Sequence, residues 1–484
     1  MKKSVVFLLV LFLFTTALFP AGSRAEADNA APAAAGDAAP PADDVDSAFV
    51  RVRLSTGGAQ RVSVAVEGTY RCNGTSFTGG MLTLELNDAH VRVLHSELGP
   101  LSDNPFIYIE RLDPDPWDAF FTLDNARYGE CRYLGDLFGC IDEEGALCLV
   151  NYVPMTQYLY GVTGGELRNT HPIEALKAQA IAAKGYALSR VGGGGAYDLT
   201  DRPADQVYKG YRPGDSRVVE AVDAVAGEYL AWNGKPVKCY YCTANGGQTL
   251  TPLLRWGASD CNGAYAMRYD PYDVAGSGRS AVVDVARDAA KWPAALMAFL
   301  LAEARAVEPQ TAAVCSIERL NGYHDAENHA GTARSPSELA PQAWAEAVLS
   351  VRLENGEVAR INCGFPLEAL LTAGVANCPD ADVWFVRGTE AGAWQVVFGV
   401  SDGHRVGMSH CGLIEMARQG FSYAEILAFY YPGAVLTQSG AALAQPAALP
   451  PEPTPYSLHI VSEPAGEAAH QEASLWGALF GWLS

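Results

Sequence analysis

The 484-residue sequence predicts an α+β protein, in which short antiparallel strands form a β-rich platform and a buried helix lines a substrate cleft. Two observations predict this fold class. Segments from Phe49 onward, such as "FVRVRL" and "HVRVLH", alternate apolar and polar residues with period two, as strands do. The later segment "PIEALKAQAIAAKGYAL" is apolar almost all round and rich in helix formers, which is typical of a buried helix.

Composition narrows the classes of partner. About half of the residues (49%) are hydrophobic, so the chain can bury a sizeable core. The formal net charge of −21 argues against nucleic acid as a partner. Eleven cysteines are an odd number, so at least one is unpaired within the chain; buried thiols and disulfides both remain open for the others.

Residues 1–25 resemble an export signal. Lys2 and Lys3 precede an apolar run from Val5 to Phe19, and the stretch "AGSRA" ends in a small-x-small cleavage pattern. The alternative is an uncleaved N-terminal anchor, although the apolar run is slightly short for a full span. Both interpretations predict an exported protein, either at the outer face of the cytoplasmic membrane or in the cell wall, and membrane-anchored if the signal stays.

The rest of the chain divides by composition. Residues 26–48 are rich in Ala, Pro and Asp and predict a disordered spacer. Residues 49–155 form the β-rich subdomain, and residues 156–440 form the core, with a less typical insertion at about 276–395. Residues 441–484 are a Pro- and Ala-rich tail with a short amphipathic end, either a contact to a membrane or partner or a frayed hydrophobic tail.

The buried helix has clear signals at both ends. The tripeptide "NTH" offers caps, Pro172 falls in the first turn, and Glu174 suits the positive end of the helix dipole. The helical pattern runs to Ser189, and the following "GGGG" ends it.

Three charged residues around this helix are candidates for chemistry. Glu166 follows two glycines, and a single glutamic acid protonates a leaving oxygen when its surroundings raise its pKa. The alternative is an ordinary loop carboxylate. Lys177 and Lys184 lie two turns apart on one helix face. They either line an anion or sugar cleft near Glu166 or extend their charges out at the edge of the core.

We expect no metal and no cofactor. Cys239 and Cys242 stand an odd step apart in a strand pattern, which points them to opposite faces and favours packed thiols over a zinc or redox pair. The Gly-rich loop "DGHRVGMSHCG" contains metal-ligating residue types without a complete ligand set: Asp402, His404, His410 and Cys411.

Taken together, three blocks resemble the stage II sporulation protein D family, also called the amidase-enhancer family. They are "VPMTQYLYGVTGGELRNTHPIEALKAQAIAAKGYAL", then "DQVYKGY" with "AVDAVAGEYLAWNGKPVKCYYCTANGGQTLTPLLRWG", and finally "GHRVGMSHCGLIEMARQGFSYAEILAFYYPGAVL". They occur in the family's order, and the resemblance covers roughly Phe49 to Leu436.

The resemblance implies a lytic transglycosylase of peptidoglycan. Such enzymes cut between N-acetylmuramic acid and N-acetylglucosamine and leave a 1,6-anhydro end without consuming water. The family's catalytic glutamate corresponds to Glu166, which acts as general acid and then as general base, so no second carboxylate is needed. The implied partners are glycan strands stripped of stem peptides by an amidase, and membrane-anchored sporulation proteins.

The resemblance also assigns substrate-binding residues. Lys177 matches the family's lysine, and Lys184 stands where arginine is usual, which keeps the charge but loses the bidentate fork. Tyr241 matches an aromatic residue before a glycine turn, and His404 and Ser409 belong to the family's glycine-histidine-glycine-valine-glycine-methionine-serine loop.

Several positions depart from the family pattern. Arg405, His410 and Cys411 replace the family's glycine, glutamine and tyrosine, and the turn after Tyr241 lacks the usual serines. Asp205 precedes Gln206 with no cysteine close by, so the zinc site of some members is not expected. These departures favour an alternative, a non-catalytic peptidoglycan-binding module that stimulates an amidase. A third, adhesin-like interpretation has only the spacer and tail in its favour.

Overall fold

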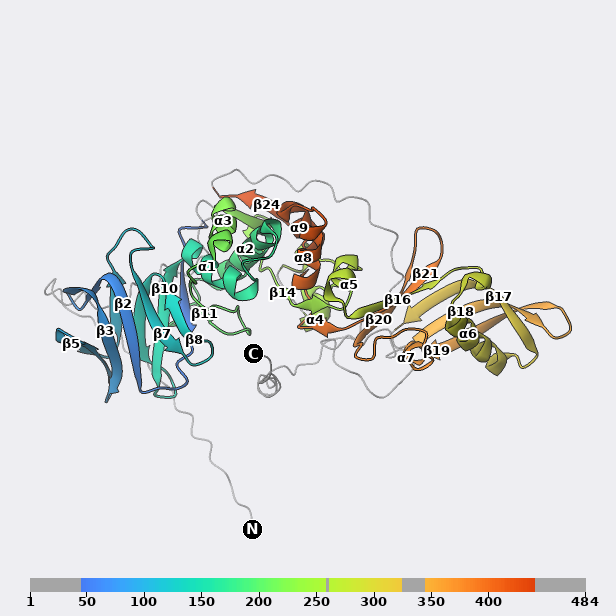
Figure 1. Cartoon of the computed structure of the whole chain (residues 1–484), viewed down its shortest axis with the longest axis horizontal. Coiled ribbons are helices and arrows are strands. Elements are labelled where there is room, and N and C mark those ends of the chain that lie inside the picture. The colour runs from blue at the N-terminus through green and yellow to red at the C-terminus, as the bar shows by residue number, and fades with distance from the viewer. Residues whose placement is uncertain (1–44, 258–260, 324–343, 440–484) are drawn as a thin grey trace, which may run out of the picture.

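The computed structural model describes residues 45–257, 261–323 and 344–439. The molecule is elongated, with a large sheet at one end, a helical part in the middle and a second mixed part at the other end (Figure 1). The predicted export signal, nearly all of the spacer and the tail lie outside the described residues. Within those residues, every helix is too short or too polar to cross a bilayer.

The N-terminal sheet has eleven strands in the order β11-β1-β10-β9-β6-β2-β3-β4-β5, and β7 pairs with β2 and β8. Only the short β1–β11 pairing is parallel. The strands are β1 Phe49–Leu54, β2 Arg61–Cys72, β3 Thr75–Asn87, β4 His90–His95, β5 Gly99–Asn104, β6 Ile107–Arg111, β7 Phe120–Asn125, β8 Gly129–Tyr133, β9 Asp136–Ile141, β10 Leu147–Pro154 and β11 Leu199–Thr200. The expected antiparallel β platform is therefore present.

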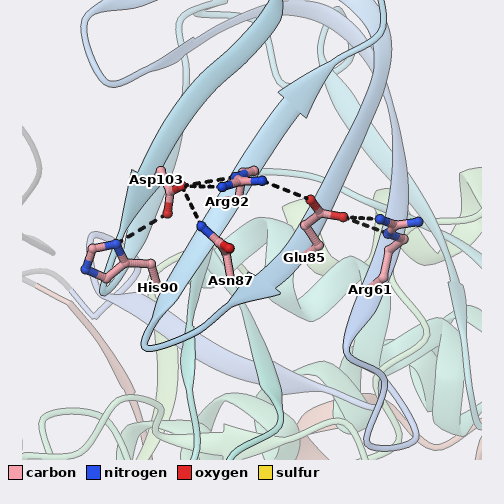
Figure 2. A network of polar contacts seen from close by, with 6 residues as sticks. All are labelled: Arg61, Glu85, Asn87, His90, Arg92 and Asp103. Atoms are coloured by element: carbon pink, nitrogen blue, oxygen red, sulfur yellow. Dashed lines mark hydrogen bonds and ion pairs between the residues drawn. The ribbon is translucent and has the colours of Figure 1, made fainter.

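Alternation along these strands divides the sheet into a core face and a solvent face. In β4, Val91 and Val93 are fully buried, whereas their neighbours face outward. On the solvent face of β2 to β5, charged and polar side chains form a continuous row of contacts (Figure 2). We call this the exposed charged row: Arg61, Glu85, Asn87, His90, Arg92 and Asp103.

The central part packs helices around α2. Thirteen of the sixteen residues of α2 are buried, so the predicted buried helix is present. The helices are α1 Met155–Glu166, α2 Ile173–Leu188, α3 Ser216–Ala224, α4 Pro252–Trp256, η2 Asn262–Ala264, α5 Pro271–Ser277, α8 His410–Arg418 and α9 Tyr423–Tyr430. Short strand pairs connect them: β12 Glu228–Trp232 with β13 Lys235–Pro236 and β24 Val435–Gln438, β14 Tyr241–Cys242 with β23 Met408–Ser409, and β15 Ala244–Asn245 with β22 Ser401–Asp402.

Two local expectations for this part need correction. The predicted caps do not bind the start of α2: Pro172 is its N-cap residue, and no side chain caps it. Structured chain also begins earlier than Phe49, within the predicted spacer. Val45 is fully buried, and Asp46 forms an ion pair with Lys184. A buried cation on α2 requires a nearby anion, which accounts for the ordering of this segment.

The second mixed part has its own hydrophobic core, whose members all lie between Val283 and Phe398. It contains two three-stranded antiparallel sheets and the helix α6, which packs on β17 and β19. Its elements are β16 Ser280–Val285, η3 Ala289–Lys291, α6 Ala294–Val307, β17 Thr311–Tyr323, β18 Trp344–Leu353, β19 Val358–Pro366, α7 Glu368–Thr372, β20 Val383–Gly388 and β21 Trp394–Gly399. Gly356 has a φ of +90° in the β18–β19 turn, so the predicted Asn-Gly hairpin is confirmed.

All eleven cysteines lie in the described residues, and no disulfide joins any two of them there. The disulfide interpretation is therefore not realised in the structure. Cys239 is fully buried against α2, where a Cβ added to Gly185 would lie 2.7 Å from its Sγ. Packing of this kind is what the sequence favoured for Cys239 and Cys242.

Candidate active site

Glu166 is the last residue of α1. The sequence had suggested a position in a loop instead. Three glycines in this helix hide its pattern, because glycine has low helix propensity. Packing explains them. A Cβ on Gly161 would lie 2.4 Å from the Tyr208 ring, and a Cβ on Gly165 would lie 2.2 Å from the Val207 carbonyl oxygen. The glycines therefore let the segment around Val207 approach α1 closely, beside Glu166.

The two oxygens of Glu166 have different surroundings. Oε1 accepts hydrogen bonds from the Val207 backbone N–H at 2.8 Å and from the Tyr241 hydroxyl at 3.2 Å. Oε2 has no hydrogen-bond partner among the described residues and is not sealed from solvent. One oxygen is therefore fixed in place by two donors, and the other has no hydrogen-bond partner among the described residues.

Behind Glu166 lies a series of hydrogen-bonded side chains that we call the buried polar chain: Tyr158, Gln206, Tyr241 and Glu166. The Tyr158 hydroxyl donates to Gln206 Oε1 at 2.8 Å, and Gln206 Nε2 donates to the Tyr241 hydroxyl at 2.8 Å. Gln206 Nε2 also donates to the Ala183 carbonyl of α2. Tyr158 and Gln206 are fully buried, so the chain holds the Tyr241 hydroxyl proton in the direction of Glu166.

Burial raises the pKa of Glu166 above its usual range, because the charged form loses hydration. The hydrogen bonds from Val207 and Tyr241 and the charge of Lys209 oppose this rise in pKa. Burial and the nearby Glu166 carboxylate raise the pKa of Tyr241 well above its ordinary value, so Tyr241 stays a neutral donor. Raised carboxyl pKa values are typical of residues that transfer protons near neutral pH.

The two lysines that the sequence predicted near Glu166 form ion pairs with other residues. Lys177 pairs with Glu174 at 2.9 Å and lies 5.5 Å from the Tyr423 ring of α9. Lys184 is 1% exposed and pairs with Asp46 at 2.5 Å. Burial lowers the pKa of Lys184, and Asp46 opposes that change. Among the described residues, both ammonium groups thus form their ion pairs with acidic partners other than Glu166.

His404 and Ser409 have clear structural contacts. His404 Nδ1 accepts from the Val406 backbone N–H, and its ring packs on Tyr240 and Trp256. Burial lowers the pKa of His404 to about 4, so the ring is neutral at pH 7. Ser409 is fully buried, caps α8 by accepting from Gly412 N–H, and donates to Asp273. Of the five predicted binding residues, only Tyr241 contacts Glu166 in the described structure.

The departures from the family pattern lie next to this site. His410 stacks on the Tyr241 ring with centroids 5.3 Å apart, and its buried Nε2 has no hydrogen-bond partner among the described residues. Burial lowers the pKa of His410 to about 4. Arg405 has a φ of +65°, a conformation that glycine adopts without strain. Cys411 is a half-buried thiol whose pKa burial raises to about 11.

Three contributors to the site were missed in the sequence. The Val207 N–H belongs to the backbone and has no side-chain signal, and Gln206 has the appearance of an ordinary polar residue. Lys209 is the cation whose charge acts on Glu166, although it stands in a different segment from the lysines of α2. The quoted stretch "DQVYKGY" contains all three, so its position after the helix was the available signal. Among the described residues no group of three or more metal-ligating side chains comes together.

The segment that holds this site is similar to a known family of proteins. A family model described as Stage II sporulation protein matches residues 143–232, which hold α1, Glu166, α2 and the segment around Val207. An uncharacterized protein of Brachyspira hyodysenteriae (strain ATCC 49526 / WA1) is 23% identical over 388 residues, covering 80% of this chain and 92% of that protein.

Two relatives come from Bacillus subtilis (strain 168). Its amidase enhancer is 25% identical over 303 residues, covering 58% of this chain and 40% of the relative. Its stage II sporulation protein D is 26% identical over 124 residues, covering 22% of this chain and 36% of the relative. The chain thus spans less than half the length of each. A solved structure, the di-domain ARO/CYC StfQ, is 9% identical and has a TM-score of 0.08, covering 80% of this chain and 97% of that one, which carries no argument about the fold.

These matches confirm the resemblance that the sequence indicated: residues 143–232 of this chain are similar to the stage II sporulation protein family.

Proposed function

We propose that this protein is a peptidoglycan lytic transglycosylase with Glu166 as its single acid/base. The observation that carries the proposal is the unequal environment of the two carboxyl oxygens of Glu166. Oε1 is held by the Val207 N–H and the Tyr241 hydroxyl, while Oε2 has no hydrogen-bond partner among the described residues and the pKa of the group is raised. A positioned carboxyl group with a raised pKa suits general acid catalysis.

The proposed reaction needs only this carboxyl. The protonated Glu166 gives its proton to the glycosidic oxygen as the bond from C1 of N-acetylmuramic acid breaks. The resulting carboxylate removes the proton of the muramic 6-hydroxyl, whose oxygen then bonds to C1. The 1,6-anhydro ring forms, no water is consumed, and Glu166 is protonated again. A hydrolase with paired carboxylates uses a second acidic group for the step that this intramolecular attack replaces.

The biological setting is part of the same proposal. The family match and the relative named amidase enhancer support a role in sporulation or cell-wall remodelling. The proposed substrate is the glycan strand of peptidoglycan after a partner amidase has removed its stem peptides. The protein then acts outside the cytoplasmic membrane, in agreement with the export signal expected from residues 1–25.

The test is the variant Glu166→Gln, which cannot donate or recover a proton. We expect it to release no anhydromuramyl products from denuded glycan, measured by mass spectrometry of soluble fragments. Glu130→Gln, at an exposed position of β8, is the matched control and should keep wild-type activity. Full activity in Glu166→Gln would show that the proposed mechanism is wrong.

The second candidate is a non-catalytic peptidoglycan-binding module that stimulates an amidase. The observation that favours it is the replacement of family residues beside Tyr241. His410 in particular stacks on the Tyr241 ring, and its buried Nε2 has no hydrogen-bond partner among the described residues. Purified sacculi separate the two candidates. Retention of the protein on sacculi without release of glycan fragments, together with faster release of stem peptides by an added amidase, supports the module.

A further inference from the structure

A second cluster lies beside the site and is not used by the mechanism above. The Lys238 ammonium lies 5.3 Å from the centroid of the Tyr186 ring and 5.1 Å from that of Tyr240. The Tyr240 ring also packs on Trp256 at 4.7 Å and on His404 at 5.9 Å. We call this cluster the aromatic–cation patch: Tyr186, Arg190, Lys238, Tyr240, Trp256 and His404.

Lys238 is a half-buried cation that lacks an anion. Among the described residues it makes no ion pair, whereas its neighbour Arg190 pairs with Asp205 at 3.3 Å. Burial lowers the pKa of Lys238, and the charge of Arg190 lowers it further, whereas Cys261 and the charge of Asp205 oppose this change without forming an ion pair with Lys238. In a chain with a net charge of −21, the Lys238 ammonium on two aromatic rings, with the charge of Arg190 acting on it, makes a local positive site. A ligand anion would relieve the repulsion between them.

Trp256 gives the patch an exposed aromatic surface. The residue is 44% exposed, although tryptophan is usually well covered in folded proteins. Its helix α4 is short and held at both ends, by the Thr251 side chain accepting from Leu254 N–H and by Gly257 with a φ of +89°. The ring is therefore presented from a defined position, and exposed aromatic rings mark places where ligands pack.

The patch is connected directly to Glu166. Three consecutive residues make the link: the Asp205 carboxylate accepts from the Tyr186 hydroxyl, Gln206 donates to Tyr241, and Val207 N–H donates to Glu166. Tyr240 and Tyr241 are also neighbours in the chain, one in the patch and one at the acid. A ligand that reaches both places must be an extended one, such as a chain of several sugar rings.

We propose that the aromatic–cation patch is a sugar subsite that stacks a pyranose ring on Trp256 and pairs Lys238 with a carboxylate carried by that sugar. The inference rests on the proposed function, and it specifies the group of the glycan substrate that the protein recognises. The apolar CH face of a pyranose packs on an aromatic ring, and an ammonium without an anion selects a negative group.

Chemistry identifies the carboxylate. In peptidoglycan that carries stem peptides, the lactyl group of muramic acid is joined to the peptide by an amide and is neutral. Hydrolysis of that amide frees a lactyl carboxylate on every second sugar. Lys238 therefore distinguishes glycan that an amidase has already processed from glycan with its peptides, and the order of the two reactions follows from this charge.

Binding measurements on the Glu166→Gln protein test the subsite, because this background is not expected to cleave its ligand. Calorimetry compares denuded glycan oligosaccharides with chitooligosaccharides of equal length, which lack the lactyl carboxylate. We expect Lys238→Met to weaken binding of the denuded glycan at least about tenfold and to leave chitooligosaccharide binding unchanged. Trp256→Ala should weaken binding of both ligands, and Trp256→Phe should restore most of it.

The matched control is Lys235→Met, at an exposed position of β13, which should change neither affinity. Circular dichroism and unfolding curves verify that each variant folds. Unchanged affinity of a folded Lys238→Met protein for denuded glycan would overturn the subsite while leaving the role of Glu166 intact. In contrast, cleavage of glycan by the Glu166→Gln protein would show that the proposed mechanism is wrong, whatever the affinity of the Lys238→Met variant.

Discussion

The exposed charged row on the N-terminal sheet and the buried polar chain behind Glu166 are both built from hydrogen-bonded polar side chains, but their surroundings differ. In the row, Arg92 contacts Asp103 at 3.0 Å with both side chains 37% exposed (Figure 2). In the chain, Tyr158 and Gln206 are fully buried and bond at 2.8 Å.

This difference in hydration decides what each region does. Water competes with the contacts of the exposed charged row and salt screens them, so they contribute little stability and leave a solubilising surface. The buried polar chain has no water to replace a lost partner, so each bond is costly to break. The same lack of water raises the pKa of Glu166. Burial therefore links stability to proton chemistry in one region only.

The largest effect is expected where the buried polar chain is cut in its middle. Gln206→Leu leaves the hydroxyls of Tyr158 and Tyr241 without their partner, and we expect a loss of about 3 kcal/mol in the free energy of unfolding. Urea denaturation measures it. Gln60→Leu, at an exposed position of the N-terminal part, is the control. Equal stability of Gln206→Leu and wild type would contradict the contrast between the regions.

A smaller loss is expected when the approach of the Val207 segment to α1 is blocked. In Gly165→Ala the new methyl would lie 2.2 Å from the Val207 carbonyl oxygen, so the backbone at Val207 must move away from α1. We expect this movement to lengthen the hydrogen bond from the Val207 N–H to Glu166 Oε1. We expect a loss of about 2 kcal/mol in the free energy of unfolding and a lower kcat. Gly388→Ala, where a Cβ meets nothing within 4 Å and φ is not positive, controls for the loss of a glycine without a clash. A kcat equal to that of the control would refute the packing argument.

The next effect concerns pH. The Tyr241 hydroxyl stabilises the charged form of Glu166 and lowers its pKa, so Tyr241→Phe should raise that pKa further. Because the first step of the proposed reaction needs the protonated acid, activity should fall as pH rises through this pKa. The alkaline limb of kcat/KM in Tyr241→Phe should therefore move to higher pH. A limb that moves to lower pH, or not at all, would show that this hydrogen bond does not control Glu166.

The smallest effect is expected in the exposed charged row. Arg61 is 69% exposed, and Arg61→Gln removes its pair with Glu85. We expect the free energy of unfolding to change by less than about 1 kcal/mol, and the change to shrink further in 1 M salt. Denaturation curves at two salt concentrations measure it. A loss as large as that of Gln206→Leu would show that this row is a structural element after all.

Much of the fold followed from periodicity. The strands β1 to β4, the hairpin at Gly356 and the helix α2 lie where alternation and helix formers predict them. Periodicity did not predict the helix α1, because its glycines lower the helix propensity and are explained by close packing instead. For the site, the resemblance selected Glu166 and Tyr241, which the structure brings together. It could not give the partner of Lys184, since that partner is Asp46, 138 positions earlier in the chain.

By itself the sequence determined which segments become strands and buried helices, because these depend on the spacing of apolar residues. It also determined that Glu166 follows a run of glycines and that α2 carries two charges. Only the tertiary structure decided how those charges are used. It directs Lys177 and Lys184 to acidic partners, places the Val207 N–H and the Tyr241 hydroxyl on Glu166, and leaves Lys238 without an anion. Burial and partnership depend on which distant segments meet, and packing rather than local spacing sets those meetings.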